Sequence, residues 1–106
     1  MMIRFAAALG AALLAAAPPV ANADAHVTID QHMFMPATII IHPGEKVTWM
    51  NKDSDVHNVT SDDGGKSFHT PLLDTGESAS LSFTAPGTFG YHCSVHPDMT
   101  GTIIVK

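Results

Sequence analysis

The chain has 106 residues and one cysteine, so it is long enough for one domain and has no partner for an internal disulfide. Hydrophobic residues make up 45% of it and charged residues 14%, which excludes a disordered polyelectrolyte and a coiled coil. Lys and Arg number 5 against 10 Asp and Glu, and the net charge of −5 excludes a protein that binds nucleic acid through a basic face.

The amino terminus has the pattern of a secretory signal peptide. Arg4 precedes a short apolar run, residues 5–17, which ends at two prolines and is followed by small residues up to Ala23. The run is shorter than the roughly 20 residues that a membrane-spanning helix needs. We therefore expect residues 1–23 to be cleaved after Ala23, and residues 24–106 to reach the periplasm as one domain without membrane insertion.

The first half of that domain predicts short strands. Apolar and polar residues alternate at Val27–Ile29 and again at Val47–Trp49, and a dense run of isoleucines lies between them at residues 37–42. A Pro-Gly turn separates the last two segments. We expect three consecutive antiparallel strands.

The second half continues the same pattern. After a polar, glycine-rich stretch at residues 51–66, alternation returns at Leu81–Phe83 and from Phe89 to Cys93, where Phe89, Tyr91 and Cys93 share one face. β-branched residues predict a last strand at residues 102–105. Short strands separated by Pro-Gly turns indicate an all-β protein, and we predict a Greek-key β-sandwich of about seven to eight strands.

The candidate chemistry lies directly after the Phe89–Cys93 segment, in the sequence Cys93-Ser94-Val95-His96-Pro97-Asp98-Met99. A thiolate, an imidazole and a thioether this close together suit copper better than zinc, which makes little use of methionine. A blue-copper site consists of two histidines, one cysteine and a weakly bound axial methionine, so one further histidine is needed. Without a metal, Cys93 would be a small buried hydrophobic residue beside an incidental histidine and a core methionine.

His57 is the best candidate for the second histidine because it follows a polar loop and opens a short strand. His42 lies beside a Pro-Gly turn, and His69 lies in a polar segment. His92 points away from Cys93 by alternation. We interpret these last three histidines as surface residues.

The sequence resembles the cupredoxins, the type 1 blue copper proteins that include plastocyanin and azurin, and within them the amicyanin-like branch. The resemblance covers nearly all of residues 24–106. The matching stretches are Val27-Thr28-Ile29, Phe34, Pro36-Ala37-Thr38, Pro43-Gly44, Val47-Thr48-Trp49, Asn51, His57-Asn58-Val59, Pro86-Gly87-Thr88-Phe89, Tyr91-His92-Cys93, His96-Pro97, Met99 and Gly101.

This resemblance implies one copper ion that cycles between Cu(II) and Cu(I), with His57, Cys93 and His96 as strong ligands and Met99 as the axial ligand. It implies one-electron transfer as the function, and it implies that Asn58 ties the two ligand loops together. We expect His96 to be the solvent-facing electron port. We expect His57 to be buried, with its other ring nitrogen bound to a backbone carbonyl or water.

The expected partner is a redox protein such as a c-type cytochrome or a periplasmic dehydrogenase, and the expected protein is a monomer and not an enzyme. Amicyanins have a proline where this chain has Val95 and an aromatic residue where it has Asp98, so an amine dehydrogenase is not assumed as the partner. The negative charge, with Asp98 beside the port, favours a basic partner surface.

Two other functions would use the same residues. A periplasmic copper carrier or buffer would pass the ion to another protein, and residues 31–35 could then form a Cu(I) cluster of one histidine and two methionines. Alternation places His32 and Phe34 on one face and the two methionines on the other, which favours core packing instead. An enzyme with Cys93 as nucleophile and His96 as base has no visible orienting residue and leaves Met99 unexplained.

Cleavage after Ala23 also suggests a second, weaker copper site. The mature chain would begin Asp24-Ala25-His26, which places a free amine, two amides and an imidazole in order. Four such nitrogens can surround Cu(II) or Ni(II) in a plane.

Overall fold

The structure is a computed structural model that describes residues 24–106; the expected signal peptide, residues 1–23, lies outside the described residues. The described residues contain no helix of the length and hydropathy that crossing a membrane requires. They form eight strands. The strands are β1 (Asp24–Asp30), β2 (Met33–Met35), β3 (Thr38–Ile41), β4 (Glu45–Asn51), β5 (Thr60–Ser61), β6 (Ser78–Phe83), β7 (Gly87–Cys93) and β8 (His96–Val105).

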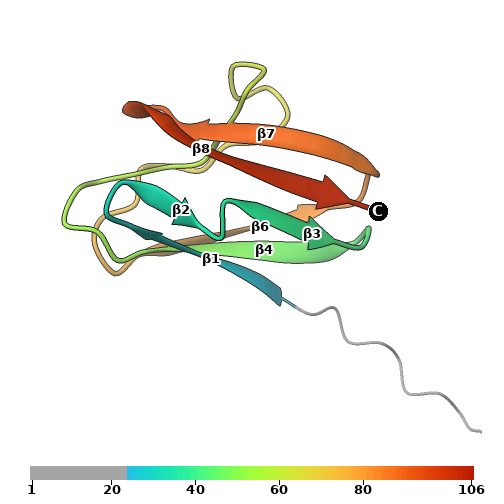
Figure 1. Ribbon diagram of the computed structural model, residues 1–106, viewed down its shortest axis with the longest axis horizontal. Coiled ribbons are helices and arrows are strands. Elements are labelled where there is room, and N and C mark those ends of the chain that lie inside the picture. Colours follow the sequence, from blue (N-terminus) through green and yellow to red (C-terminus); the bar gives the residue numbers. More distant parts are fainter. Residues whose placement is uncertain (1–23) are drawn as a thin grey trace, which may run out of the picture.

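The strands form a sandwich of two four-stranded sheets, in the orders β2-β1-β4-β6 and β3-β8-β7-β5 (Figure 1). Each sheet turns one face inward, as the alternation predicted. The buried side chains of β4 are Val47, Trp49 and Asn51, and β8 contributes the buried side chains of Ile103 and Val105. The prediction of an all-β sandwich is confirmed.

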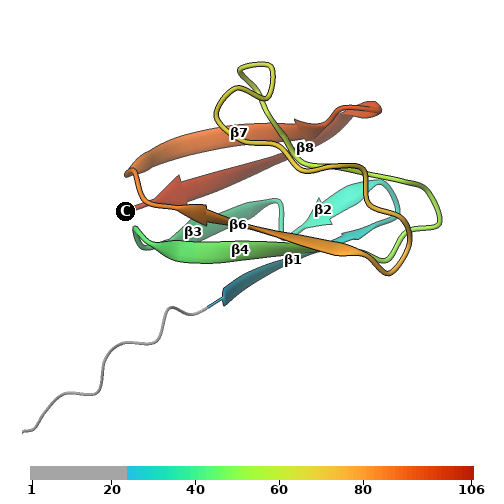
Figure 2. The same ribbon diagram turned by 180° about the vertical axis from the view of Figure 1, so that it is seen from behind.

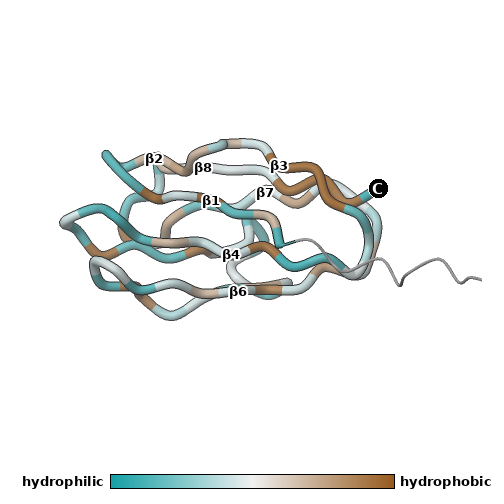
Figure 3. Tube along the Cα trace, turned by 90° about the horizontal axis from the view of Figure 1, so that it is seen from below, coloured by the Kyte–Doolittle hydropathy of each residue, from teal (hydrophilic) through white to brown (hydrophobic). Residues whose placement is uncertain are grey.

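The expected antiparallel order of the first three strands is wrong. β1 pairs with β4 in parallel, with Val27 opposite Trp49, and β3 belongs to the other sheet, where it pairs in parallel with β8. Parallel neighbours need a crossover connection, and here the chain visits the second sheet as β3 before it returns as β4. Figure 3 shows a strongly hydrophobic run at β3, which is the edge strand beside β8; Ile41 of this run is buried, whereas Ile40 is exposed.

The core between the sheets is built around two large aromatic residues. Trp49 from β4 donates a hydrogen bond from its Nε1 to the hydroxyl of Tyr91 from β7, at 3.2 Å, and their rings meet edge to face. Phe34 also packs edge to face against Tyr91, with ring centroids 4.8 Å apart. Burial raises the pKa of Tyr91 to about 12, so its hydroxyl stays protonated.

A long connection, residues 52–77, joins β4 to β6 and runs along one side of the sandwich (Figure 2). It pairs briefly with β7 as β5, where Thr60 lies opposite His92. It also brings His57 opposite Leu73 in an isolated bridge. The start of this connection, the β1–β2 turn and the β7–β8 turn all lie at the end of the sandwich opposite the carboxyl terminus (Figure 1).

Candidate metal centre

Cys93 and His96 face each other across a tight turn. β7 ends at Cys93 and β8 begins at His96, so only Ser94 and Val95 lie between the paired residues. The register then jumps, because His92 pairs with Thr100, and the three residues 97–99 bulge out of β8. Such bulges redirect side chains next to functional sites.

His57 approaches the same turn from the long connection. Its backbone exchanges two hydrogen bonds with Leu73, of 3.3 Å and 2.8 Å, and its side chain is fully buried. These bonds hold the ring against the β7–β8 turn.

The structure brings His57, Cys93 and His96 together. The Sγ atom of Cys93 lies 3.7 Å from Nδ1 of His57 and 3.7 Å from Nδ1 of His96, and the two Nδ1 atoms are 3.1 Å apart. Donors bound at about 2.0–2.3 Å to one shared ion would have separations of this size. A thiolate and two imidazoles also form the donor chemistry of a blue-copper site, so these residues fit one copper ion.

Met99, the expected axial ligand, lies at the same end. It is 4% exposed and lines a cavity of about 360 Å³ that His96 also lines. His96 itself is only partly buried, whereas Cys93 is fully buried.

The second ring nitrogen of His57 has an unexpected partner. Nε2 lies 2.8 Å from a carboxylate oxygen of Asp53, so the expected backbone carbonyl or water is wrong. Asp53 is 8% exposed, and hydrogen bonds from the backbone N–H of His32 and from the His57 ring lower its pKa to about 2. An ionised Asp53 therefore accepts a hydrogen bond from the Nε2–H of His57. This fixes the tautomer in which Nδ1 carries no proton and can bind a metal ion.

Asn58 ties the two ligand segments together, as the resemblance implied. Its side-chain oxygen accepts a hydrogen bond of 2.8 Å from the backbone N–H of Ser94, inside the β7–β8 turn. The Cys93 turn and the His57 loop are thereby fixed to each other.

The other histidines divide into two groups. His42 and His69 are exposed, and His92 turns away from the centre toward Asp62, 2.7 Å from its carboxylate, so the surface interpretation of these three is confirmed. His32 differs, because its ring lies 4.4 Å from that of His96. Sequence reasoning had placed it only on the same face as Phe34.

Two weaker sequence hypotheses concern segments that the structure places in strands. Met33 and Met35 are 48% and 46% exposed, so their expected core packing is wrong, although Phe34 between them is buried. Asp24 to His26 form the start of β1 and pair with β4. A planar chelate at these three residues would require them to leave β4.

Comparisons with known proteins agree with this geometry. The family model of the cupredoxin-like domain matches residues 4–105. Amicyanin-alpha of Methylorubrum extorquens is 34% identical over 103 residues, which is 94% of this chain and 87% of the relative. Plastocyanin of Scenedesmus fuscus is 35% identical over 85 residues, 70% of this chain and 87% of the relative.

Solved structures are similar over most of the described fold. A purple cupredoxin from Nitrosopumilus maritimus has a TM-score of 0.72 and 31% identity, and the alignment covers 77% of this chain and 99% of that one. The Cu(I) form of an amicyanin variant has a TM-score of 0.72 and 30% identity, and the alignment covers 83% of this chain and 87% of that one.

Proposed function

The chain belongs to the cupredoxin-like family, and we propose that it is a periplasmic blue copper protein that carries single electrons between redox proteins. Its cofactor is one copper ion, which supplies a Cu(II)/Cu(I) couple when bound. The observation that carries the proposal is the convergence of one thiolate and two imidazoles within 3.7 Å of each other. We assign His57, Cys93 and His96 as strong ligands and Met99 as the axial ligand.

The surroundings of these donors support retention of the metal and passage of electrons. Cys93 and His57 are both 0% exposed, and a buried thiolate and imidazole are poorly placed to hand an ion to another protein. This favours electron transfer over a copper carrier. Four protein donors also leave no position for a substrate, which favours electron transfer over catalysis.

His96 is the proposed electron port because it is the least buried of the three strong donors. Exposed apolar side chains lie next to the donors in the sequence at Val56 and Val95, and a third, Leu72, precedes Leu73, which pairs with His57. Asp98 lines the cavity beside His96 and is exposed. We infer a monomer that meets a basic redox partner, such as a c-type cytochrome or a dehydrogenase, through an apolar patch with acidic side chains beside it.

The location in the periplasm rests on the sequence of residues 1–23 and on the similarity to amicyanins. We propose that these residues are a signal peptide and that residues 24–106 are the mature cupredoxin domain. Mass spectrometry of the protein from a periplasmic extract would test the expected cleavage after Ala23.

Absorption spectroscopy tests the proposed centre. The apoprotein should develop an intense visible band with one equivalent of Cu(II), lose it with one electron per copper and regain it on reoxidation. Cys93→Ser should lack the band, because a hydroxyl is a harder and less acidic donor than a thiol. His92→Ala is the control, since this neighbouring histidine faces Asp62 and should be dispensable. A protein that binds Cu(I) and resists oxidation would contradict electron transfer and favour the carrier function.

A further inference from the structure

The β1–β2 turn presents a histidine that the electron-transfer function does not use. Gln31 and His32 connect Asp30 to Met33, which are paired across the hairpin, and both have positive φ angles, of 51° and 56°. Asn, Asp and Gly are the usual residues in such a turn because a larger side chain is strained there. The chain nevertheless places an imidazole at this position.

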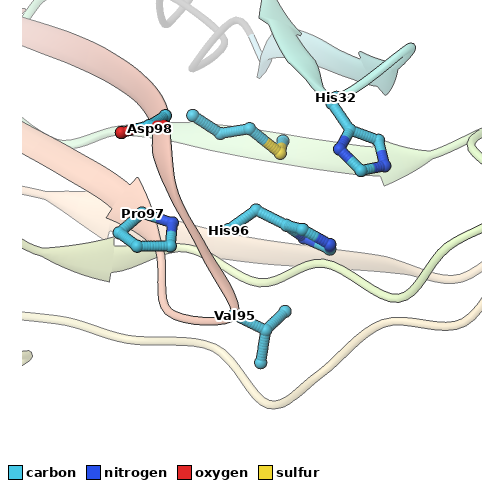
Figure 4. Close-up of a pocket in the computed structure, with 6 residues that line it drawn as sticks. His32, Val95, His96, Pro97 and Asp98 are labelled. Atoms are coloured by element: carbon cyan, nitrogen blue, oxygen red, sulfur yellow. The ribbon is translucent and has the colours of Figure 1, made fainter.

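The His32 side chain lies between solvent and the metal centre. It is 47% exposed, and its Nε2 lies 2.6 Å from a carboxylate oxygen of Asp55, which is itself 56% exposed. Its ring is 4.4 Å from the ring of His96 and 5.1 Å from that of His57. Figure 4 shows His32 and His96, from different elements, beside the cavity that both line.

The candidate ligand atoms of His32 overlap with the inner donor set. One ligating atom from each of His32, Asp55 and His96 lies within 4.8 Å of the other two, and the same holds for His32, Asp53 and His57. Each of these outer sets therefore shares one histidine with the inner set. An ion bound in either of them is already close to a ligand of the final site.

We propose that His32 and Asp55 form a capture site, which binds Cu(II) at the surface and delivers it to His57, Cys93 and His96. The proposal rests on the proposed function, since it requires the inner site to be the destination. Imidazole and carboxylate donors bind Cu(II), and the inner set adds a thiolate, so the ion gains a stronger ligand as it moves inward.

The delivery is a ligand exchange without oxidation or reduction. His32 and Asp55 release the ion while the shared His96 keeps it bound, and the Cys93 sulfur replaces them. The thiol proton of Cys93 leaves to solvent as the thiolate binds. The copper would stay Cu(II) throughout, and His57 and Met99 would bind it as His32, Asp55 and any bound water leave.

Loading kinetics test this proposal. Apoprotein is mixed with Cu(II) in a stopped-flow instrument, and the growth of the visible band is followed over a range of copper concentrations. The wild-type rate should level off at high copper, because capture precedes delivery. His32→Asn should remove this plateau and slow loading at low copper by roughly tenfold, the lower end of the effect of losing a residue that supports a metal site. Asn tolerates positive φ, so this variant keeps the turn.

The chain offers a matched control in His92→Ala, which removes a second surface histidine paired with an aspartate. It should load at the wild-type rate. The final band and the copper content of His32→Asn should equal those of the wild type, which a merely structural role for His32 would not predict. Equal loading rates for wild type and His32→Asn, or equal slowing by His92→Ala, would overturn the capture site. Absence of any band in the wild type would instead refute the proposed centre.

Discussion

Replacing Asn58 with Ala should loosen the connection between the two ligand segments. The Asn58 side chain is almost fully buried, and its oxygen accepts hydrogen bonds from the Ser94 N–H at 2.8 Å and from the Thr60 hydroxyl at 3.3 Å. The Ser94 bond is the shorter of the two and the one that joins separate segments. Its loss leaves a backbone donor without a partner at the edge of the metal centre.

The magnitude follows from that single donor. An unsatisfied, partly buried N–H costs about 1–2 kcal/mol, the lower part of the usual range, because Ser94 itself is exposed. In a domain of this size, 1 kcal/mol shifts the melting temperature by about 4–8 °C. We therefore expect Asn58→Ala to lower the melting temperature of the apoprotein by about 4–16 °C.

Thermal unfolding followed by circular dichroism measures this effect. Asn58→Asp keeps an acceptor for Ser94 and should lose less stability than Asn58→Ala. Thr60→Val removes only the longer bond and is the matched control. The role given to the Ser94 bond would be refuted if Asn58→Ala had the same melting temperature as the wild type, or if Thr60→Val lowered the melting temperature as much as Asn58→Ala does.

Three further substitutions test other parts of the structure. Gly101→Ala should destabilise the fold by about 1–3 kcal/mol, because a Cβ atom at this position would overlap the ring of Tyr91. Urea titration measures the effect, and an unchanged unfolding midpoint would contradict this packing. The pKa of Asp63 lies below its usual 3.8, chiefly because its carboxylate accepts a hydrogen bond from the Ser61 hydroxyl. The carboxylate therefore stabilises the fold above pH 3.8, and this contribution is lost as the pH falls through the folded pKa. The stability deficit of Asp63→Asn should therefore be largest near neutral pH and vanish in strong acid, whereas a deficit independent of pH would contradict this. Met99→Gln should keep copper bound but lower the reduction potential in voltammetry, because an amide oxygen favours Cu(II) more than a thioether does, and an unchanged potential would mean that Met99 is not axial.

The strands of this fold follow from local alternation, but their partners do not. Val47 and Trp49 on β4, and Tyr91 and Cys93 on β7, are buried as their spacing predicted. The parallel pairing of β1 with β4 depends on the detour of the chain through the other sheet as β3. No local pattern encodes such a detour, so the antiparallel expectation failed there.

The same distinction applies to the metal centre. Cys93, His96 and Met99 lie within seven residues in the sequence, and their donor types alone indicated copper. Asp53 and His32 were missed because their roles arise only when the connection after β4 folds against the β1–β2 turn. The one local signal was an acidic residue four positions before His57, in a loop where acidic residues are common.

Asp53 holds part of the metal centre in place through protein contacts. Its carboxylate makes three contacts that join the β1–β2 turn to the connection after β4: it accepts the His32 N–H at 3.0 Å, the His57 ring N–H at 2.8 Å and the Ser54 N–H at 2.8 Å. The hydrogen bond to Asp53 orients the His57 ring, and Asn58 holds the Cys93 turn against the His57 loop. Donors held in place by protein contacts move little when the charge of the bound ion changes. A rigid donor set of this kind is what rapid exchange of single electrons requires, whereas the His32 ring, bound to the exposed Asp55, lies at the surface where an incoming ion would meet it.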